Sequence, residues 1–330
     1  MRMRAITIVG QGGPEVLRLT EVATPTPGPG QLRIRVHAAG LNRADLLQAR
    51  GLYPAPPGAP SDIPGLEYSG EVEAVGPDTR RFSVGDRVMG ITGGGAFAEF
   101  VVVHEDEALE LPKRLGYAEG AAVPEAFLTA FDAVVLQGGL QASEVLLVHA
   151  ATSGVGTAAI QIGHQWGAIV AGTGRSQEKL ERCRPLGLSH LVTVTHTPPR
   201  FAEALRKSLG RGVDVALDLL GGPYVGETLA VMAPRGRILQ VGTLAGAQAP
   251  LDLALLMRMR LRLTGTVLRS RSLAEKVALA RAFEEKLHGP LCDGRLRPVL
   301  AGTLPFTSIE EAFAQMASNA TLGKLVLTWD

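Results

Sequence analysis

The residues best suited to chemistry lie at 149–161, HAATSGVGTAAIQ, where small residues join an apolar stretch to a helical pattern. In a dinucleotide-binding turn, small residues let the backbone approach a pyrophosphate, which N–H groups at the helix start then bind. The three glycine places of that fingerprint are taken here by Ala151, Ser153 and Gly156. Including the flexible backbone of the turn, the predicted contacts are Ala151, Ser153, Gly154, Val155 and Gly156. Taken alone, the motif also fits an ordinary tight strand-to-helix turn.

The end of the following strand should distinguish NAD from NADP. An NAD site has an acid about 20 residues after the fingerprint, which binds the ribose hydroxyls. This chain instead has GTGRSQEK at 172–179, and its first acid, Glu178, falls inside the next predicted helix. Cations at the start of a helix are often merely solvated. Here, however, the acid of an NAD site is absent and basic residues stand near its place, which favours NADPH. The residues expected around a 2′-phosphate are Gly174, Arg175, Ser176 and Lys179.

These motifs require an α/β scaffold. From about Tyr117, apolar segments alternate with helical ones, which indicates a parallel sheet covered on both faces. Strands are predicted at 144–150, 168–173, 189–194, 214–219, 237–243 and 260–268, and helices include 154–166 and 177–184.

The first 115 or so residues show a different pattern, with alternating strands at 32–38, 67–75 and 97–103. Asn42 is placed to cap a short helix over Arg43–Arg50, and the stretches 24–30 and 53–65 are turn-rich connectors. At the other end, a helix over Leu273–Leu287, a helix over 308–317 and a strand over 324–329 should return to the first domain. The predicted domains are 1–121 with 269–330, and 122–268.

Composition narrows the function classes. The net charge of +1 lacks the positive excess that is typical of nucleic-acid-binding proteins. No apolar run approaches the length of a membrane span. Two widely separated cysteines, Cys183 and Cys292, exclude a disulfide framework and a cysteine-rich metal site, and they favour a cytoplasmic location.

Several segments together resemble a known family, the zinc-independent quinone oxidoreductases of the medium-chain dehydrogenase/reductase superfamily. The resemblance is to the zeta-crystallin-like group, and within it to the tumour-suppressor-inducible quinone oxidoreductases. It implies a GroES-like, mostly-β catalytic domain, a Rossmann domain with a doubly wound parallel sheet, and an active site in the cleft between them. The segments that carry it are 12–17, 39–57, 64–76, 84–88, 123–131, 149–161, 268–271 and 319–327.

The resemblance also implies that no metal is used. Zinc-dependent relatives have a cysteine, a histidine and a second cysteine where this chain has Asn42, Leu66 and the Pro124–Glu125 pair. Leu66 cannot ligate a metal, and the seven histidines form no ligand spacing. We therefore expect no zinc alkoxide chemistry, and Glu67 is expected to be a structural carboxylate.

Further site residues follow from the same resemblance. Asn42 and Thr129 are expected near the nicotinamide, although Thr129 also fits a helix threonine bonded to its own backbone. Tyr53 is expected to line the substrate cleft, where its phenol can hydrogen-bond or protonate a reduced quinone oxygen. The alternative for Tyr53 is packing against the prolines at 54, 56 and 57.

The remaining expected cofactor contacts lie late in the chain. Backbone groups of Val241, Gly242 and Thr243 follow a strand end, and those of Leu268, Arg269 and Ser270 form a turn. Asn319 and Lys324 match a loop that closes over the cofactor, and a plain surface position fits Lys324 equally well. Against NADPH, some relatives place a tyrosine after the third strand, whereas this chain has TVTH at 193–196.

The last strand of the parallel sheet, 260–268, is an apolar edge that favours a homodimer, as in the family. Arg258, Arg260 and Arg262 would alternate on one face and could instead protect that edge.

The sequence therefore predicts an NADPH-dependent, zinc-free quinone oxidoreductase in which hydride passes to a quinone and Tyr53 and Asn42 shape the site. An enone or 2-alkenal reductase would use the same chemistry on a C=C bond. A hypothesis of another class is an NADPH-binding protein with little catalysis, crystallin-like or RNA-binding.

Overall fold

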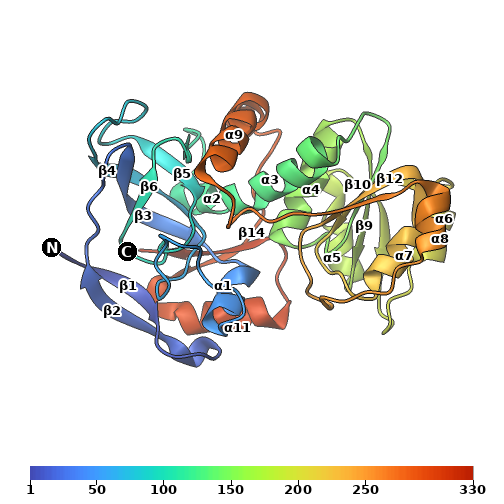
Figure 1. The fold of residues 1–330 in the computed structure, drawn as a ribbon, viewed down its shortest axis with the longest axis horizontal. Coiled ribbons are helices and arrows are strands. Elements are labelled where there is room, and N and C mark those ends of the chain that lie inside the picture. Colours follow the sequence, from blue (N-terminus) through green and yellow to red (C-terminus); the bar gives the residue numbers. More distant parts are fainter. Residues whose placement is uncertain (330) are drawn as a thin grey trace. The chain divides into compact units, whose positions relative to one another are not determined.

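The computed structural model describes residues 1–329, which divide into two compact units. Among these residues, unit 1 comprises 1–128 and 268–329, and unit 2 comprises 129–267. The first and the last of the described residues both belong to unit 1 (Figure 1). Among residues 1–329, no helix combines the length and the apolar character needed to cross a bilayer.

Unit 1 is built on a mixed sheet of seven strands in the order β14-β15-β3-β4-β5-β7, with β6 paired to β3, and a separate β1–β2 hairpin. Its strands are β1 (Arg2–Ile8), β2 (Leu17–Ala23), β3 (Gln31–Gly40), β4 (Glu67–Val75), β5 (Arg87–Ile91), β6 (Phe100–His104), β7 (Ala108–Glu110), β14 (Leu300–Pro305) and β15 (Lys324–Thr328). Its helices include α1 (Arg43–Ala49), α2 (Tyr117–Ala121), α9 (Leu273–Phe283), α10 (Gly289–Asp293) and α11 (Ile309–Ser318). The C-terminal strand β15 pairs antiparallel with β3 of the N-terminal part of the chain.

The alternation that predicted β3 places Leu32, Ile34 and Val36 in the core. They share one buried cluster with Phe97 and Phe306, which meet edge to face at 5.8 Å between ring centroids. β3 therefore ties the N-terminal strands to the C-terminal ones.

Unit 2 is a six-stranded parallel sheet in the order β10-β9-β8-β11-β12-β13, so the predicted doubly wound sheet is confirmed. The strands are β8 (Val145–Val148), β9 (Ile169–Gly174), β10 (Leu188–Thr193), β11 (Val213–Asp218), β12 (Met232–Gln240) and β13 (Arg262–Gly265). The helices are α4 (Gly154–Gln165), α5 (Gln177–Glu181), α6 (Ala202–Leu209), α7 (Tyr224–Val231) and α8 (Leu253–Met259). All four residues of the central strand β8 are buried, as a sheet covered on both faces requires. Helix α3 (Pro124–Phe131) contains the boundary between the two units.

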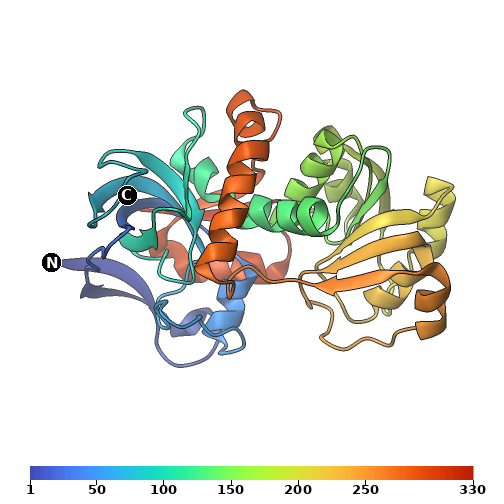
Figure 2. The same ribbon diagram turned by 45° about the horizontal axis from the view of Figure 1, so that its top comes forward.

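Two predicted elements differ from the structure. The strand expected over 260–268 is only four residues long, because Arg260 adopts a left-handed conformation with φ 53° and ends α8. Arg258 lies in α8, so the predicted alternation of Arg258, Arg260 and Arg262 on one strand face is wrong. The helix expected over Leu273–Leu287 is regular only to Phe283. It continues through a π-helical segment, Glu284–His288, into α10, and Figure 2 shows the three as one rod.

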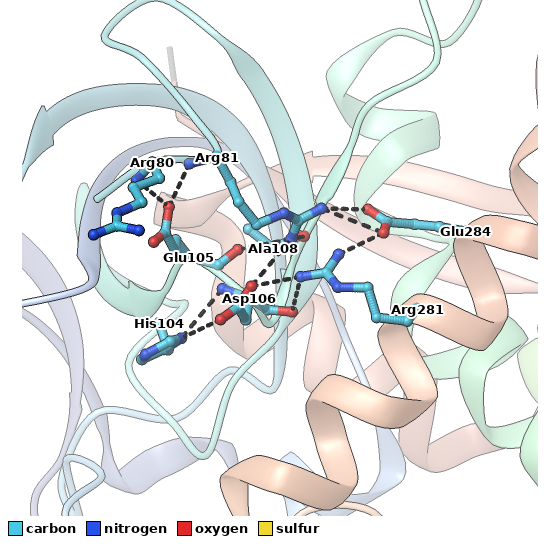
Figure 3. Close-up of polar contacts among 8 residues, drawn as sticks. All are labelled: Arg80, Arg81, His104, Glu105, Asp106, Ala108, Arg281 and Glu284. Atoms are coloured by element: carbon cyan, nitrogen blue, oxygen red, sulfur yellow. Dashed lines mark hydrogen bonds and ion pairs between the residues drawn. The ribbon is translucent and has the colours of Figure 1, made fainter. Parts of the chain in front are cut away.

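A ring of four charges fixes this rod to the turn between β6 and β7 (Figure 3). Arg281 contacts Asp106 at 2.7 Å and Glu284 at 2.5 Å. Arg81 contacts the same Glu284 at 2.9 Å and the same Asp106 at 3.9 Å. Each charge has two partners of opposite sign, an arrangement that stabilises a surface contact more than isolated pairs do.

Candidate functional site

The predicted phosphate-binding turn leads from β8 into α4. Ser153 is the N-cap of α4, and its Oγ accepts a hydrogen bond from the Gly156 N–H at 3.0 Å. The N–H groups of Gly154 and Val155 have no hydrogen-bond partner among residues 1–329. Two unpaired donors at the start of a helix are what a pyrophosphate requires.

Close packing explains why Gly156 is a glycine. A Cβ atom there would lie 2.4 Å from the carbonyl oxygen of Ala150 and 2.7 Å from the carbonyl carbon of Ala151. Ala150 itself has φ 48°, a left-handed conformation uncommon for a residue with a side chain. Ala151 is fully buried, so its methyl group packs inside the unit. The backbone of this turn therefore fits a dinucleotide even without the first two glycines.

The end of β9 carries the predicted 2′-phosphate residues. Ser176 caps α5, accepting from the Lys179 N–H at 3.3 Å, and Arg175 is exposed next to it. Gly174 ends β9 and is partly exposed, and Glu178 points to solvent from α5. The site thus presents cations and a hydroxyl where an NAD-binding relative would present a carboxylate.

Tyr224, at the start of α7, was missed by sequence reasoning. Its ring is half-buried against Phe201 and His149, with centroids at 5.7 Å and 5.4 Å. Burial raises the pKa of Tyr224, and the Arg175 guanidinium opposes that rise. A phenol therefore lies within electrostatic reach of Arg175, although the TVTH segment supplies no tyrosine. No local motif signals it, because Tyr224 follows a different strand.

The remaining predicted contacts in unit 2 follow β12 or lie in α3. The N–H groups of Val241 and Gly242 both donate to the carbonyl of Asp218, at 2.8 Å and 3.4 Å, whereas Thr243 is exposed. Thr129 is buried in α3, and its hydroxyl makes no hydrogen bond within residues 1–329. The alternative of a threonine bonded to its own backbone is therefore wrong.

Unit 1 contains a cluster of polar side chains, here termed the polar cluster: Asn42, Asp45, Tyr53, Glu67, Glu125, Arg269 and Lys324. At its centre, the Lys324 ammonium contacts Glu67 Oε1 at 2.5 Å. It also donates to Asn42 Oδ1 at 2.6 Å and to the Leu41 carbonyl at 2.9 Å. Lys324 is 5% exposed, so the alternative of a plain surface position is wrong. All three of its N–H donors are used inside unit 1.

Glu67 and Asn42 complete this network. Asn42 Nδ2 donates to Glu67 Oε1 at 2.8 Å and to the Gly40 carbonyl at 3.2 Å. Glu67 Oε2 accepts the Glu125 N–H at 2.8 Å, at the start of α3. Every polar atom of the Asn42 side chain is thus engaged, which fixes its orientation.

Asp45 is fully buried in α1. It accepts the N–H groups of Asn42 at 2.8 Å and of Gly65 at 3.1 Å. Burial, opposed by these two bonds, raises the pKa of Asp45 to about 7.

Arg269 holds Tyr53. Its guanidinium donates to the carbonyls of Tyr53 and Gly93, at 3.0 Å and 2.9 Å, and to Gln48 Oε1 at 2.6 Å. It lies over the Tyr53 ring, 5.0 Å from the centroid. Burial, followed by the Glu125 carboxylate, raises the pKa of the Tyr53 phenol, and Arg269 opposes both effects. Among the residues predicted from the 268–270 turn, Leu268 and Arg269 are buried and Ser270 is exposed.

Asn319 lies outside this cluster. It ends α11 in a left-handed conformation, and its side-chain oxygen accepts a hydrogen bond from Arg43.

The donor set of the polar cluster does not suit a metal ion. Leu66 is apolar, and an ammonium already occupies the contacts of Glu67 and Asn42. Within residues 1–329, no three His, Cys, Asp or Glu side chains are grouped so as to hold a metal.

Comparisons with known proteins agree with this architecture. A family model described as "Alcohol dehydrogenase GroES-like domain" matches residues 28–113, and one described as "Zinc-binding dehydrogenase" matches residues 154–284. A quinone oxidoreductase of Sus scrofa is 32% identical over 330 residues, covering 98% of this chain and 97% of the relative.

Solved structures are similar over nearly the whole chain. An NAD-dependent alcohol dehydrogenase superposes with a TM-score of 0.87 at 32% identity, covering 99% of this chain and 100% of that one. The enoyl reductase CurK superposes with a TM-score of 0.86 at 29% identity, covering 99% of each chain.

Proposed function

The chain belongs to the medium-chain dehydrogenase/reductase superfamily, and from that premise we propose that it is an NADPH-dependent, zinc-independent quinone oxidoreductase. The observation that carries the proposal is the polar cluster, in which the Lys324 ammonium pairs with Glu67 and the Arg269 guanidinium lies over the Tyr53 ring. This combination supplies a proton donor and a fixed cation without a Lewis acid.

Unit 2 is the proposed cofactor-binding domain and unit 1 the catalytic domain. A bound NADPH supplies the hydride. The free N–H groups of Gly154 and Val155 would hold its pyrophosphate. Arg175, with Ser176 and Lys179, would neutralise its 2′-phosphate. Superfamily members use a nicotinamide cofactor, and the residues after β9 support NADPH over NADH.

Tyr53 is the proposed proton donor to the acceptor. Its raised pKa keeps the phenol protonated at neutral pH, so it can hydrogen-bond an oxygen that becomes negative. The Arg269 guanidinium over the ring would stabilise the phenolate left after transfer. Asn42, whose amide is bound by Lys324 and Glu67, shapes the site through its fixed position.

One second candidate has support from a specific observation. The similarity to an enoyl reductase favours reduction of an activated C=C bond in an enone or 2-alkenal by the same hydride chemistry.

The proposed assembly is a homodimer through β13. All four residues of this edge strand are exposed, and within residues 1–329 the strand pairs only with β12. We propose a cytoplasmic location because both cysteines, Cys183 and Cys292, are free thiols.

The test measures oxidation of NADPH and of NADH with a panel of quinones and 2-alkenals. We expect fast NADPH turnover with a quinone, slower turnover with NADH, and a loss of about a hundredfold in kcat for Tyr53→Phe. Faster turnover of alkenals than of quinones would establish the second candidate. NADPH binding without turnover of any acceptor would reject an enzyme and favour the cofactor-binding hypothesis.

A further inference from the structure

The parallel sheet of unit 2 offers separate places for the two ends of a dinucleotide. In a doubly wound sheet, the ligand lies outside the carboxyl ends of the strands, across the point where the strand order reverses. That point is between β8 and β11, because β9 and β10 extend to one side and β12 and β13 to the other. The proposed 2′-phosphate residues follow β9. The nicotinamide end therefore belongs to the other side, at the ends of β11 and β12.

The backbone donors that follow β12 are already used. Val241 and Gly242 donate their N–H groups to the Asp218 carbonyl at 2.8 Å and 3.4 Å. A little further on, the Ala245 N–H donates to the Leu220 carbonyl at 2.7 Å. These bonds tie the segment after β12 to the turn after β11, so the three N–H groups are not available to a cofactor.

Gln240, the last residue of β12, has one unused polar atom at this place. Its Nε2 donates to the Gly242 carbonyl at 2.6 Å and to the Asp218 carbonyl at 3.2 Å. Because both partners are acceptors, the amide nitrogen must face them and the amide oxygen must face the other way. Within residues 1–329, Oε1 receives no hydrogen bond, and it is not sealed from solvent because Gln240 is only partly buried. Gln240 thus presents a hydrogen-bond acceptor in a fixed orientation.

We propose that Gln240 is a cofactor-binding residue whose Oε1 accepts a hydrogen bond from the carboxamide NH₂ of the nicotinamide ring; this rests on the proposed NADPH-dependent function. The carboxamide is the hydrogen-bonding group of that ring, and its nitrogen only donates. An acceptor that is already held in place loses little freedom when the ligand binds. The bond would also restrict rotation of the ring and so fix which face of its C4 atom is turned to the substrate.

The test combines one change in the protein with one change in the cofactor. In 3-acetylpyridine adenine dinucleotide phosphate, a methyl group replaces the amide nitrogen, so the donor is lost at nearly constant size. We expect the parent protein to bind NADP⁺ about fivefold or more tightly than this analogue, because the analogue leaves Oε1 unpaired. In Gln240→Leu, the two dissociation constants should lie within about twofold of each other. Isothermal titration measures all four values.

Comparing two ligands separates the proposed contact from a structural role. Gln240→Leu also removes the bonds that hold Gly242 and Asp218 together, but their loss should weaken both dinucleotides equally. Gln240→Glu retains an acceptor oxygen and should keep the preference for NADP⁺. Gln248→Leu, at an exposed position in the following loop, is the matched control and should keep both parent affinities.

Equal weakening of both dinucleotides in Gln240→Leu, with the preference of the parent protein unchanged, would overturn the proposal. If Gln240→Leu does not fold, loss of the preference in Gln240→Glu would contradict it as well. Failure of the proposed function gives a different result. Binding without turnover of any acceptor would reject the enzyme and leave the comparison of ligands valid, whereas a parent protein that binds neither dinucleotide would reject the proposed cofactor and this inference with it.

Discussion

Lys324 gives unit 1 a buried positive charge that organises the residues around it. Three acceptors surround its ammonium, and one of them is the fully buried carboxylate of Glu67. Removing one partner of a buried pair leaves the other charge uncompensated, which costs more than the pair contributes.

We therefore expect Lys324→Met to lower the free energy of unfolding by about 3–5 kcal/mol. Adding Glu67→Gln to this variant should recover part of the loss, because it removes the orphaned charge. Denaturant unfolding of the single and double variants measures both effects. Lys113→Met, an exposed position in unit 1, is the control and should stay within about 0.5 kcal/mol of the parent. Equal losses in the two lysine variants would contradict the central role of Lys324.

At the scale of residues, sequence reasoning named most members of the polar cluster but not their contacts. Lys324 and Asn42 are 282 positions apart, so no local pattern could pair them. The sequence singles out Glu125 only as a position that matches a metal ligand in relatives. Its backbone contact with Glu67, 58 positions away, arises only from tertiary structure.

Among the elements, the turn from β8 into α4 restricts most strongly which residue type can occupy one position, Gly156. A Cβ at Gly156 would meet backbone atoms, which cannot move aside as a side chain can. We expect Gly156→Ala to weaken NADPH binding at least tenfold and to lower the melting temperature, as measured by cofactor fluorescence and thermal unfolding. Gly226→Ala is the matched control, because a Cβ in this exposed part of α7 meets nothing within 4 Å. It should be stabilising by up to about 1 kcal/mol. Equal NADPH affinity in the two variants would refute the close-approach argument.

The segment after β9, together with α7, should set the choice of cofactor. Arg175→Ala is expected to raise the Kd for NADPH about tenfold or more and to leave that for NADH nearly unchanged, because only NADPH has the 2′-phosphate. Tyr224→Phe should show a smaller effect of the same sign. Isothermal titration with both cofactors measures this preference, and Arg182→Ala, exposed at the end of α5, is the control. A parallel loss of affinity for both cofactors would place Arg175 outside the phosphate site.

The spacing of apolar residues predicted an element well where the pattern extends over several residues. β4 lies at Glu67–Val75, as predicted, because its side chains alternate between two environments. β13 was predicted too long, because an apolar run cannot show that Arg260 takes a left-handed conformation and ends α8. The π-helical segment after Phe283 likewise leaves no signal in the spacing of apolar residues.

For the whole molecule, the open edge of the parallel sheet is the feature that bears on assembly. Leu263 is 38% exposed on β13, a strand that pairs only with β12 in the part of the chain that the structure describes. We expect Leu263→Glu to convert a dimer into a monomer, because a charge on each copy would face its equivalent across the paired strands. Light scattering after size-exclusion chromatography measures the mass, with Val84→Glu as an exposed control in unit 1. A dimer that survives in Leu263→Glu would exclude this edge as the interface.

The chain order of the two units has a consequence for biosynthesis. Unit 2 is one continuous segment, 129–267, whereas unit 1 needs residues from both ends of the chain. Asp45 and Glu67 emerge from the ribosome early, but Arg269 and Lys324 follow more than 200 residues later. During translation, the N-terminal strands therefore carry Asp45 and Glu67 without the cations Arg269 and Lys324 while the whole of unit 2 is synthesised. Lys324, the later of the two cations in the polar cluster, completes the contacts of Glu67 and Asn42, and a nascent chain arrested before it should remain protease-sensitive in its N-terminal part.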